Sequence, residues 1–124
     1  MKLLKKEKEI ENEILDYLSQ FPSKLKVWKV ETVGVFDPCK KIFRKKHNKH
    51  YLRGTPDIQG YLKTVPPIPL YIEVKSKTGK LSPEQTMFLF EASRDGCIAF
   101  MARSVDEVRV KLYEFCLSIG QVLE

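Results

Sequence analysis

The chain has 124 residues, of which 43% are hydrophobic and 31% are charged, and these values are typical of a globular protein with one core. The net charge of +6 favours a polyanionic partner but does not by itself identify nucleic acid. The sequence contains no apolar run long enough for a transmembrane helix, and its three scattered cysteines exclude a disulfide framework or a zinc ribbon. We therefore expect one domain over residues 1–124, with reduced cysteines, no signal peptide and no membrane contact, located in the cytoplasm.

Apolar residues at helical spacing predict a first helix over residues 3–20. At about 100° per residue, Glu7 and Glu11 lie on the apolar side of this helix, next to Ile10 and Ile14. An inward glutamate has two explanations that the sequence leaves open: it reaches past the boundary of the buried face to water, or it faces a functional site.

Alternating residues predict a strand over residues 24–33, and residues 34–53 show no clean period. This second segment is basic, has interleaved aromatic residues and contains no acid after Asp37, so we expect a loop that contacts phosphates. Its basic residues are Lys40, Lys41, Arg44, Lys45, Lys46, Lys49 and Arg53. A solvated surface loop is the alternative. A zinc site is not expected, because Cys39, His47 and His50 lack a fourth ligand and lie among cations.

The GTPD sequence at residues 54–57 predicts a turn, followed by a strand over residues 57–62. Three prolines exclude regular structure over residues 63–69, and residues 70–75 predict the most apolar strand, expected at the centre of the sheet. A basic turn with Lys77 and Lys80 comes next and adds two further candidate phosphate contacts.

The remaining elements are a helix, a strand and a helix. Ser82, Pro83 and Gln85 form a capping-box sequence that predicts a helix ending near Arg94. Residues 97–102 predict a buried strand, and residues 105–119 predict a last helix. The order is α-β-β-β-α-β-α, and the helix between the third and fourth strands requires that these two strands be parallel.

Two acids and a lysine meet on one face if the second and third strands pair antiparallel. Glu73 and Lys75 are two apart on one strand and share a face, and Asp57 would lie opposite or diagonal to them. Two carboxylates on a half-buried face are costly unless they hold a divalent metal. Asp57 and Glu73 are thus candidate Mg²⁺ ligands, together with the backbone carbonyl of Val74 and a glutamate from the first helix.

Such a site suits hydrolysis of a phosphodiester, because a bound metal polarises the phosphoryl oxygen and acidifies a water. Lys75 would hold that water or stabilise the developing charge. Gln85 would cap its own helix or face the site. The alternative is a salt-bridged surface hairpin, since a glutamate and a lysine two apart on a strand are common.

These residues together resemble the VRR-NUC family of the PD-(D/E)XK nucleases, in particular its stand-alone viral and bacterial members. The GTPD turn, the EVK of residues 73–75 and the LSPEQ of residues 81–85 carry the resemblance, and the order of elements agrees over nearly the whole chain. The resemblance implies a restriction-endonuclease-like αβββαβ core, with a mixed sheet flanked by helices and an extra C-terminal helix.

The resemblance also implies roles for individual residues. Asp57 and Glu73 match the metal carboxylates, Lys75 the catalytic lysine and Gln85 the glutamine that opens the following helix. For the helix-one glutamate, Glu11 is favoured and Glu7 is second. The expected metal is Mg²⁺, with Mn²⁺ as a substitute.

The expected function is metal-dependent, structure-selective DNA cleavage, most of all of branched DNA such as Holliday junctions, by a homodimer. The last helix and residues 97–102 are candidates for the dimer surface. One alternative is a restriction-type or general nicking nuclease. Another, of a different class, is a non-catalytic DNA-binding module on the same fold.

Overall fold

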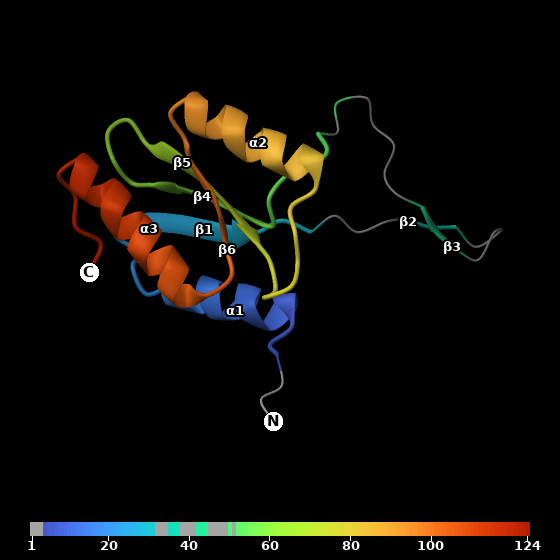
Figure 1. Ribbon diagram of the computed structural model, residues 1–124. Coiled ribbons are helices and arrows are strands. Elements are labelled where there is room, and N and C mark those ends of the chain that lie inside the picture. The colour runs from blue at the N-terminus through green and yellow to red at the C-terminus, as the bar shows by residue number, and fades with distance from the viewer. Residues whose placement is uncertain (1–3, 32–34, 38–41, 45–49, 51) are drawn as a thin grey trace.

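The computed structural model describes residues 4–31, 35–37, 42–44, 50 and 52–124. A four-stranded sheet forms its middle layer (Figure 1). In spatial order the strands are β1 (Leu25–Lys29), β4 (Ile58–Leu62), β5 (Ile68–Val74) and β6 (Ile98–Ala102). Helices α1 (Glu7–Leu18) and α3 (Val105–Ser118) cover one face, and α2 (Pro83–Arg94) lies on the other. None of the described helices is long and apolar enough to cross a membrane.

The sheet is mixed. β1, β4 and β5 pair antiparallel in succession, and β5 and β6 pair parallel across the α2 crossover, as the order of elements predicted. β5 is central, as predicted, because β4 and β6 both pair with it. α1 precedes these strands in the sequence and α3 follows them. The fold is therefore restriction-endonuclease-like, which confirms the expected fold class.

The core lies between the sheet and the layer formed by α1 and α3. Residues spaced three and four apart on α1, such as Ile14 and Leu18, have no exposed surface. They meet Ile72 and Val74 from β5, which are also fully buried. Alternate residues of β5 therefore face this core, while Glu73 and its neighbours two residues away face the α2 side.

Two expectations about the middle of the chain are wrong. Residues 34–53 were expected to lack regular structure, but β2 (Val35–Asp37) and β3 (Ile42–Arg44) form a separate antiparallel pair (Figure 1). Strands of three residues are too short to register as a period. The proline-rich segment was expected to end at residue 69, yet β5 already begins at Ile68. Pro69 is tolerated because pairing with β6 starts only at Leu70, so β5 is still an edge strand at this point.

α2 begins at its predicted capping box, and α3 also begins at a serine cap. The Ser82 hydroxyl accepts a hydrogen bond from the Gln85 backbone N–H, and the Gln85 side chain accepts one from the Ser82 N–H, which completes the capping box. At the other end of α2, Gly96 takes a φ of +93°. The Ser104 hydroxyl caps α3 in the same way, by accepting from Glu107 N–H.

Candidate active site

Two carboxylates meet where β4 begins and β5 ends. Ile58 pairs with Ile72, so Asp57, one residue earlier, lies beside Glu73, one residue later. Asp57 is half-buried and Glu73 is 2% exposed. The side chains of Asp57 and Glu73 are thus held by paired backbones at one edge of the sheet, on the α2 side.

A third carboxylate comes from the first turn of α1. Ligand oxygens of Glu7, Asp57 and Glu73 all lie within 4.8 Å of one another. Oδ2 of Asp57 and Oε2 of Glu73 are buried and make no hydrogen bond in the described structure. Buried polar atoms without partners are unusual and call for a missing ligand.

Lys75 and Gln85 both contact Glu73. Lys75 Nζ lies 3.6 Å from Glu73 Oε1, and the lysine side chain is 13% exposed. Gln85 Nε2 donates to the same Oε1 at 3.0 Å, while Gln85 Oε1 accepts from Ser82 N–H at 2.9 Å. The two roles considered for Gln85 are therefore compatible, since its amide group caps α2 and orients Glu73 at once.

The turn before Asp57 packs against the start of α2. Gly54 has a φ of +80°, and a Cβ at this position would lie 2.5 Å from the backbone carbonyl of Glu84 and 2.7 Å from Gln85 N. Only glycine fits so close to another backbone. This contact joins the Asp57 turn to the helix that carries Gln85.

Burial sets the electrostatics of the site. It is the main reason that the pKa of Glu73 rises from 4.5 to about 8, with the neighbouring Asp57 adding to the rise and Lys75 opposing it. The pKa of Asp57 is also raised, first by burial and then by the charges of Glu11 and Glu7. A nearby cation would lower both values, and binding it would release protons.

The residues present fit a hard divalent cation. The three acids offer carboxylate oxygens, which are the donors that Mg²⁺ and Mn²⁺ prefer, and two buried oxygens lack any other partner. Val74, whose carbonyl was a further candidate ligand, lies between Glu73 and Lys75 at the end of β5.

Glu11, the favoured helix-one ligand, lies near Asp57 but outside the cluster of three carboxylates. It is 5% exposed, but the described carboxylate cluster contains Glu7 in its place. Glu11 Oε1 instead lies 3.0 Å from Lys29 Nζ, and forms an ion pair with β1. Both glutamates are turned inward, as the sequence predicted, but the structure gives them different neighbours.

The candidate phosphate-contacting residues are only partly described. Arg53, Lys77 and Lys80 are exposed, and the last two lie just after Lys75. Arg44 ends β3, and its side chain is not described. The other members of the basic loop lie outside the described residues: Lys40, Lys41, Lys45, Lys46 and Lys49.

Sequence reasoning missed Lys29 and the packing of Gly54. A signal for Lys29 was present, because it shares the inward face of its strand with Leu25 and Val27, and a lysine there needs an acid. No signal distinguished the role of Gly54 from that of an ordinary turn glycine, since its neighbour α2 is distant in sequence.

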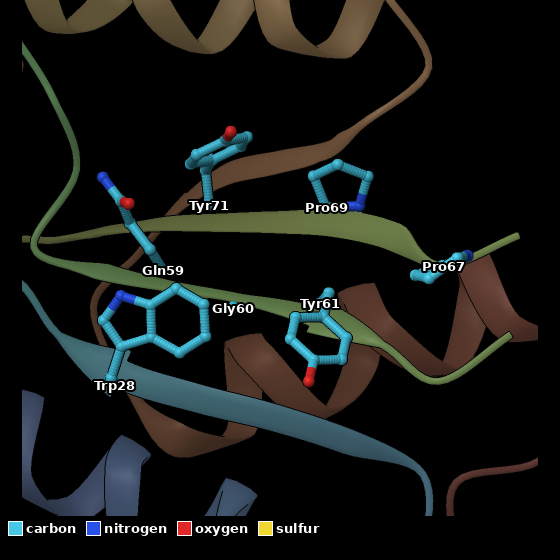
Figure 2. A pocket seen from close by; sticks show the side chains of 7 residues that line it. All are labelled: Trp28, Gln59, Gly60, Tyr61, Pro67, Pro69 and Tyr71. Carbon is cyan, nitrogen blue, oxygen red and sulfur yellow. The ribbon is translucent and has the colours of Figure 1, made fainter.

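A groove lined by aromatic residues lies on the same sheet face as Glu73. Trp28, Gln59 and Tyr71 lie at one end of it, and Pro69 and Pro67 at the other (Figure 2). Trp28 is 42% exposed and packs edge-to-face on Tyr61, with 6.2 Å between ring centroids. Gln59 lies two residues after Asp57, and its partner Tyr71 lies two residues before Glu73, so the groove leads toward the carboxylates.

Comparison with known families agrees with this geometry. A family model described as the VRR-NUC domain matches residues 6–106, which include every carboxylate of the cluster. The chain belongs to the VRR-NUC family. VRR-NUC domains are of the PD-(D/E)XK type, a superfamily of nucleases that use divalent metals, and this identifies the protein as a nuclease that acts on DNA. No curated protein and no solved structure matches the chain.

Proposed function

We propose that this VRR-NUC protein is a Mg²⁺-dependent, structure-selective endonuclease that hydrolyses phosphodiester bonds in branched DNA. One observation carries the proposal: three carboxylates lie within 4.8 Å of one another, and the ammonium group of Lys75 lies 3.6 Å from the buried one. The buried Oδ2 of Asp57 and Oε2 of Glu73, which accept no hydrogen bond in the described structure, fit oxygens that bind a cation.

Glu7, Asp57 and Glu73 would hold the metal, with the Val74 carbonyl as a neutral ligand. When bound, Mg²⁺ supplies Lewis-acid polarisation of the phosphate and lowers the pKa of a water, and Mn²⁺ can take its place. Glu11 is not part of this ligand set, because its carboxylate is engaged by Lys29.

The chain's own residues prepare the attack. Lys75 is a fixed cation beside Glu73, placed to orient the attacking water and to stabilise negative charge that develops on the phosphate. Gln85 holds the Glu73 carboxylate in one orientation through its hydrogen bond. The reacting groups are thereby kept in place before the substrate arrives.

DNA binding would use the cationic surface around the site. Arg53, Lys77 and Lys80 flank the carboxylates in sequence and are exposed. With the basic residues of segment 40–49 they would follow the phosphate backbone, so affinity should fall with increasing salt. Phosphate contacts carry no base information, which favours recognition of DNA shape over sequence.

We propose a homodimer with the aromatic groove at its interface. α2, which lies on the same face of the sheet as the groove, exposes Met87 and Phe90, at 55% and 60%. In a two-fold interface, these apolar side chains of one protomer would enter the groove of the other. Lys26 on β1 and Glu91 on α2, both exposed, add charges of opposite sign to the same surface.

The experiment that tests the proposed function uses a labelled four-way junction, a flap and a plain duplex, each with and without Mg²⁺. We expect Mg²⁺-dependent cutting of the branched substrates. Asp57→Asn should reduce the cleavage rate by at least roughly 100-fold, the scale seen when one preorganised electrostatic group is lost. Binding of the junction should persist, because it rests on phosphate contacts.

Asp16→Asn is the matched control, since Asp16 is an exposed acid on α1 and should tolerate the same change. Equal cutting of all three substrates would favour a general nicking nuclease. Binding without cutting of any substrate would contradict the proposal and favour a non-catalytic module.

A further inference from the structure

Glu11 on α1 and Lys29 on β1 form an ion pair close to the carboxylate cluster. Glu11 lies one helical turn after Glu7 on α1, and its side chain is 7% exposed. Lys29 ends β1, and its Nζ lies 3.0 Å from Glu11 Oε1. A nearly buried carboxylate is costly without a partner, so the position of α1 against β1 is coupled to this contact.

The same end of β1 is bonded to the backbone of Asp57. Lys29 pairs with Ile58, and the Val30 N–H donates to the Asp57 carbonyl at 2.7 Å. Lys29 therefore lies between the helix that supplies one candidate metal ligand and the strand that supplies another.

Apolar contacts alone would not fix the rotation of α1 about its own axis. Ile10 and Ile14 bury their surface against the core, but hydrophobic packing has no preferred direction. An ion pair one turn from Glu7 adds a fixed point, and so limits rotation that would carry the Glu7 carboxylate away from Asp57.

The pair also sets the charge of the site. Lys29 neutralises Glu11, which leaves three cluster carboxylates and Lys75, a formal charge of −2 when all groups are ionised. This charge matches one divalent cation. Without Lys29, Glu11 would be a fourth, uncompensated acid beside Asp57, where its charge already acts.

We propose that Lys29 is a positioning residue, which through its ion pair with Glu11 holds α1 so that Glu7 meets Asp57 and Glu73. The proposal rests on the proposed metal site. It assigns Glu11 to the support of that site and not to the ligand set.

A double-mutant cycle tests this, with Mn²⁺ alone as the probe and the EPR signal of the free ion as the readout, in the absence of DNA. Lys29→Met should weaken Mn²⁺ binding by about 10-fold or more, as expected when a residue that orients a ligand is lost. Glu11→Met should have a similar effect, because it removes the ion pair between α1 and β1 and leaves Lys29 only the exposed Glu31, 3.8 Å away. The double variant should bind within about threefold of the wild type, since an apolar pair can replace a buried ion pair.

Three controls complete the cycle. Lys29→Arg should retain affinity, because it keeps the charge. Glu31→Met removes the exposed second carboxylate, 3.8 Å from Lys29, and should have no effect. Glu7→Gln should abolish binding in every background. Circular dichroism establishes that each variant is folded, and if either single change unfolds the protein, the double variant and Lys29→Arg decide the question.

The outcomes separate the two proposals. If Lys29→Met leaves affinity unchanged or raises it, or if the double variant binds as weakly as Glu11→Met, the positioning role is wrong. The second result would make Glu11 a ligand while the metal site itself stands. Failure of the wild type to bind Mn²⁺ would overturn both the positioning role and the proposed metal site.

Discussion

The most informative single residue is Glu73, because its buried carboxyl group is costly to ionise. Its pKa of about 8 results from burial first and from Asp57 second, with Lys75 only partly compensating. In the metal-free protein at neutral pH, the group therefore holds a proton that a metal would displace. Metal affinity should accordingly rise with pH up to about 8.

The same shift predicts a pH dependence of stability. Between pH 4.5 and about 8, folded Glu73 retains a proton that the unfolded chain has released. The metal-free protein must then lose stability as pH rises through this window, and Asp57, whose pKa is raised too, acts in the same direction. Thermal unfolding in EDTA from pH 5 to 9 should show a falling Tm, and Mg²⁺ should reduce the fall.

Glu73→Gln should flatten this dependence, because it removes the titrating group. Glu114→Gln, an exposed acid on α3, should leave it unchanged. An unaltered pH slope in Glu73→Gln would mean that the group does not ionise in this window.

At the residue scale, sequence was sufficient to predict that Asp57, Glu73, Lys75 and Gln85 would converge. Their spacing on strands and at a helix cap is a local property, so alternation and capping rules locate them. The choice between Glu7 and Glu11 is different. Both face inward on α1, and only the packing of that helix against β1 determines which one reaches the cluster.

At the scale of elements, the junction between residues 54–57 and α2 holds the site together. Gly54 touches the backbone of Glu84 and Gln85, and Gln85 in turn bonds Glu73. Displacing the start of α2 would therefore disturb both the Asp57 turn and the orientation of Glu73.

Gly54→Ala tests this, with Gly96→Ala as a matched control. Both glycines have positive φ, but a Cβ at Gly96 meets nothing within 4 Å. Gly96→Ala should lower the free energy of unfolding by about 1 kcal/mol from backbone strain alone. Gly54→Ala should lower it by about 1–3 kcal/mol more, because the methyl group overlaps backbone atoms.

Denaturant unfolding measures the stability of both variants. Their cleavage rates are then compared at a temperature at which both are folded. Gly54→Ala should also slow cleavage, and Gly96→Ala should not. If Gly54→Ala and Gly96→Ala lowered the free energy of unfolding equally, α2 would have moved to make room for the added methyl group, and the close contact would not hold the site together.

The long elements were predictable because their signals are local. The capping box of α2, the serine cap of α3 and the apolar periods place both helices and the central strand within a few residues. The short pair of β2 and β3 was not predictable, since three residues make no period. β5 can begin at Ile68, before Pro69, because its pairing with β6 starts only at Leu70. That pairing is a tertiary contact, which local sequence signals do not reveal.

At the scale of the whole molecule, the two sheet faces differ in how they are covered. α1 and α3 close one face, whereas α2 leaves the aromatic groove open on the other (Figures 1 and 2). Exposed aromatic residues beside an apolar helix ridge are typical of protein interfaces. This surface differs from the last helix and the strand at residues 97–102, which the sequence suggested.

Trp28→Asp should convert the proposed dimer to a monomer, because it places a charge in the buried centre of the interface. Tyr113→Asp, which is 60% exposed on α3, tests the last helix and should leave the dimer intact. Light scattering after gel filtration measures both masses. A monomeric wild type, or dissociation only by Tyr113→Asp, would contradict the assignment of this surface.

The central claim is that Glu7, Asp57 and Glu73 form the metal site, and a crystal soaked in Mn²⁺ tests it most directly. Anomalous scattering should show the ion bound by carboxylate oxygens of these three residues, at distances of about 2.0–2.3 Å. Glu11 should remain paired with Lys29. An ion bound by Glu11 in place of Glu7, or no ion between Asp57 and Glu73 at saturating Mn²⁺, would contradict the account.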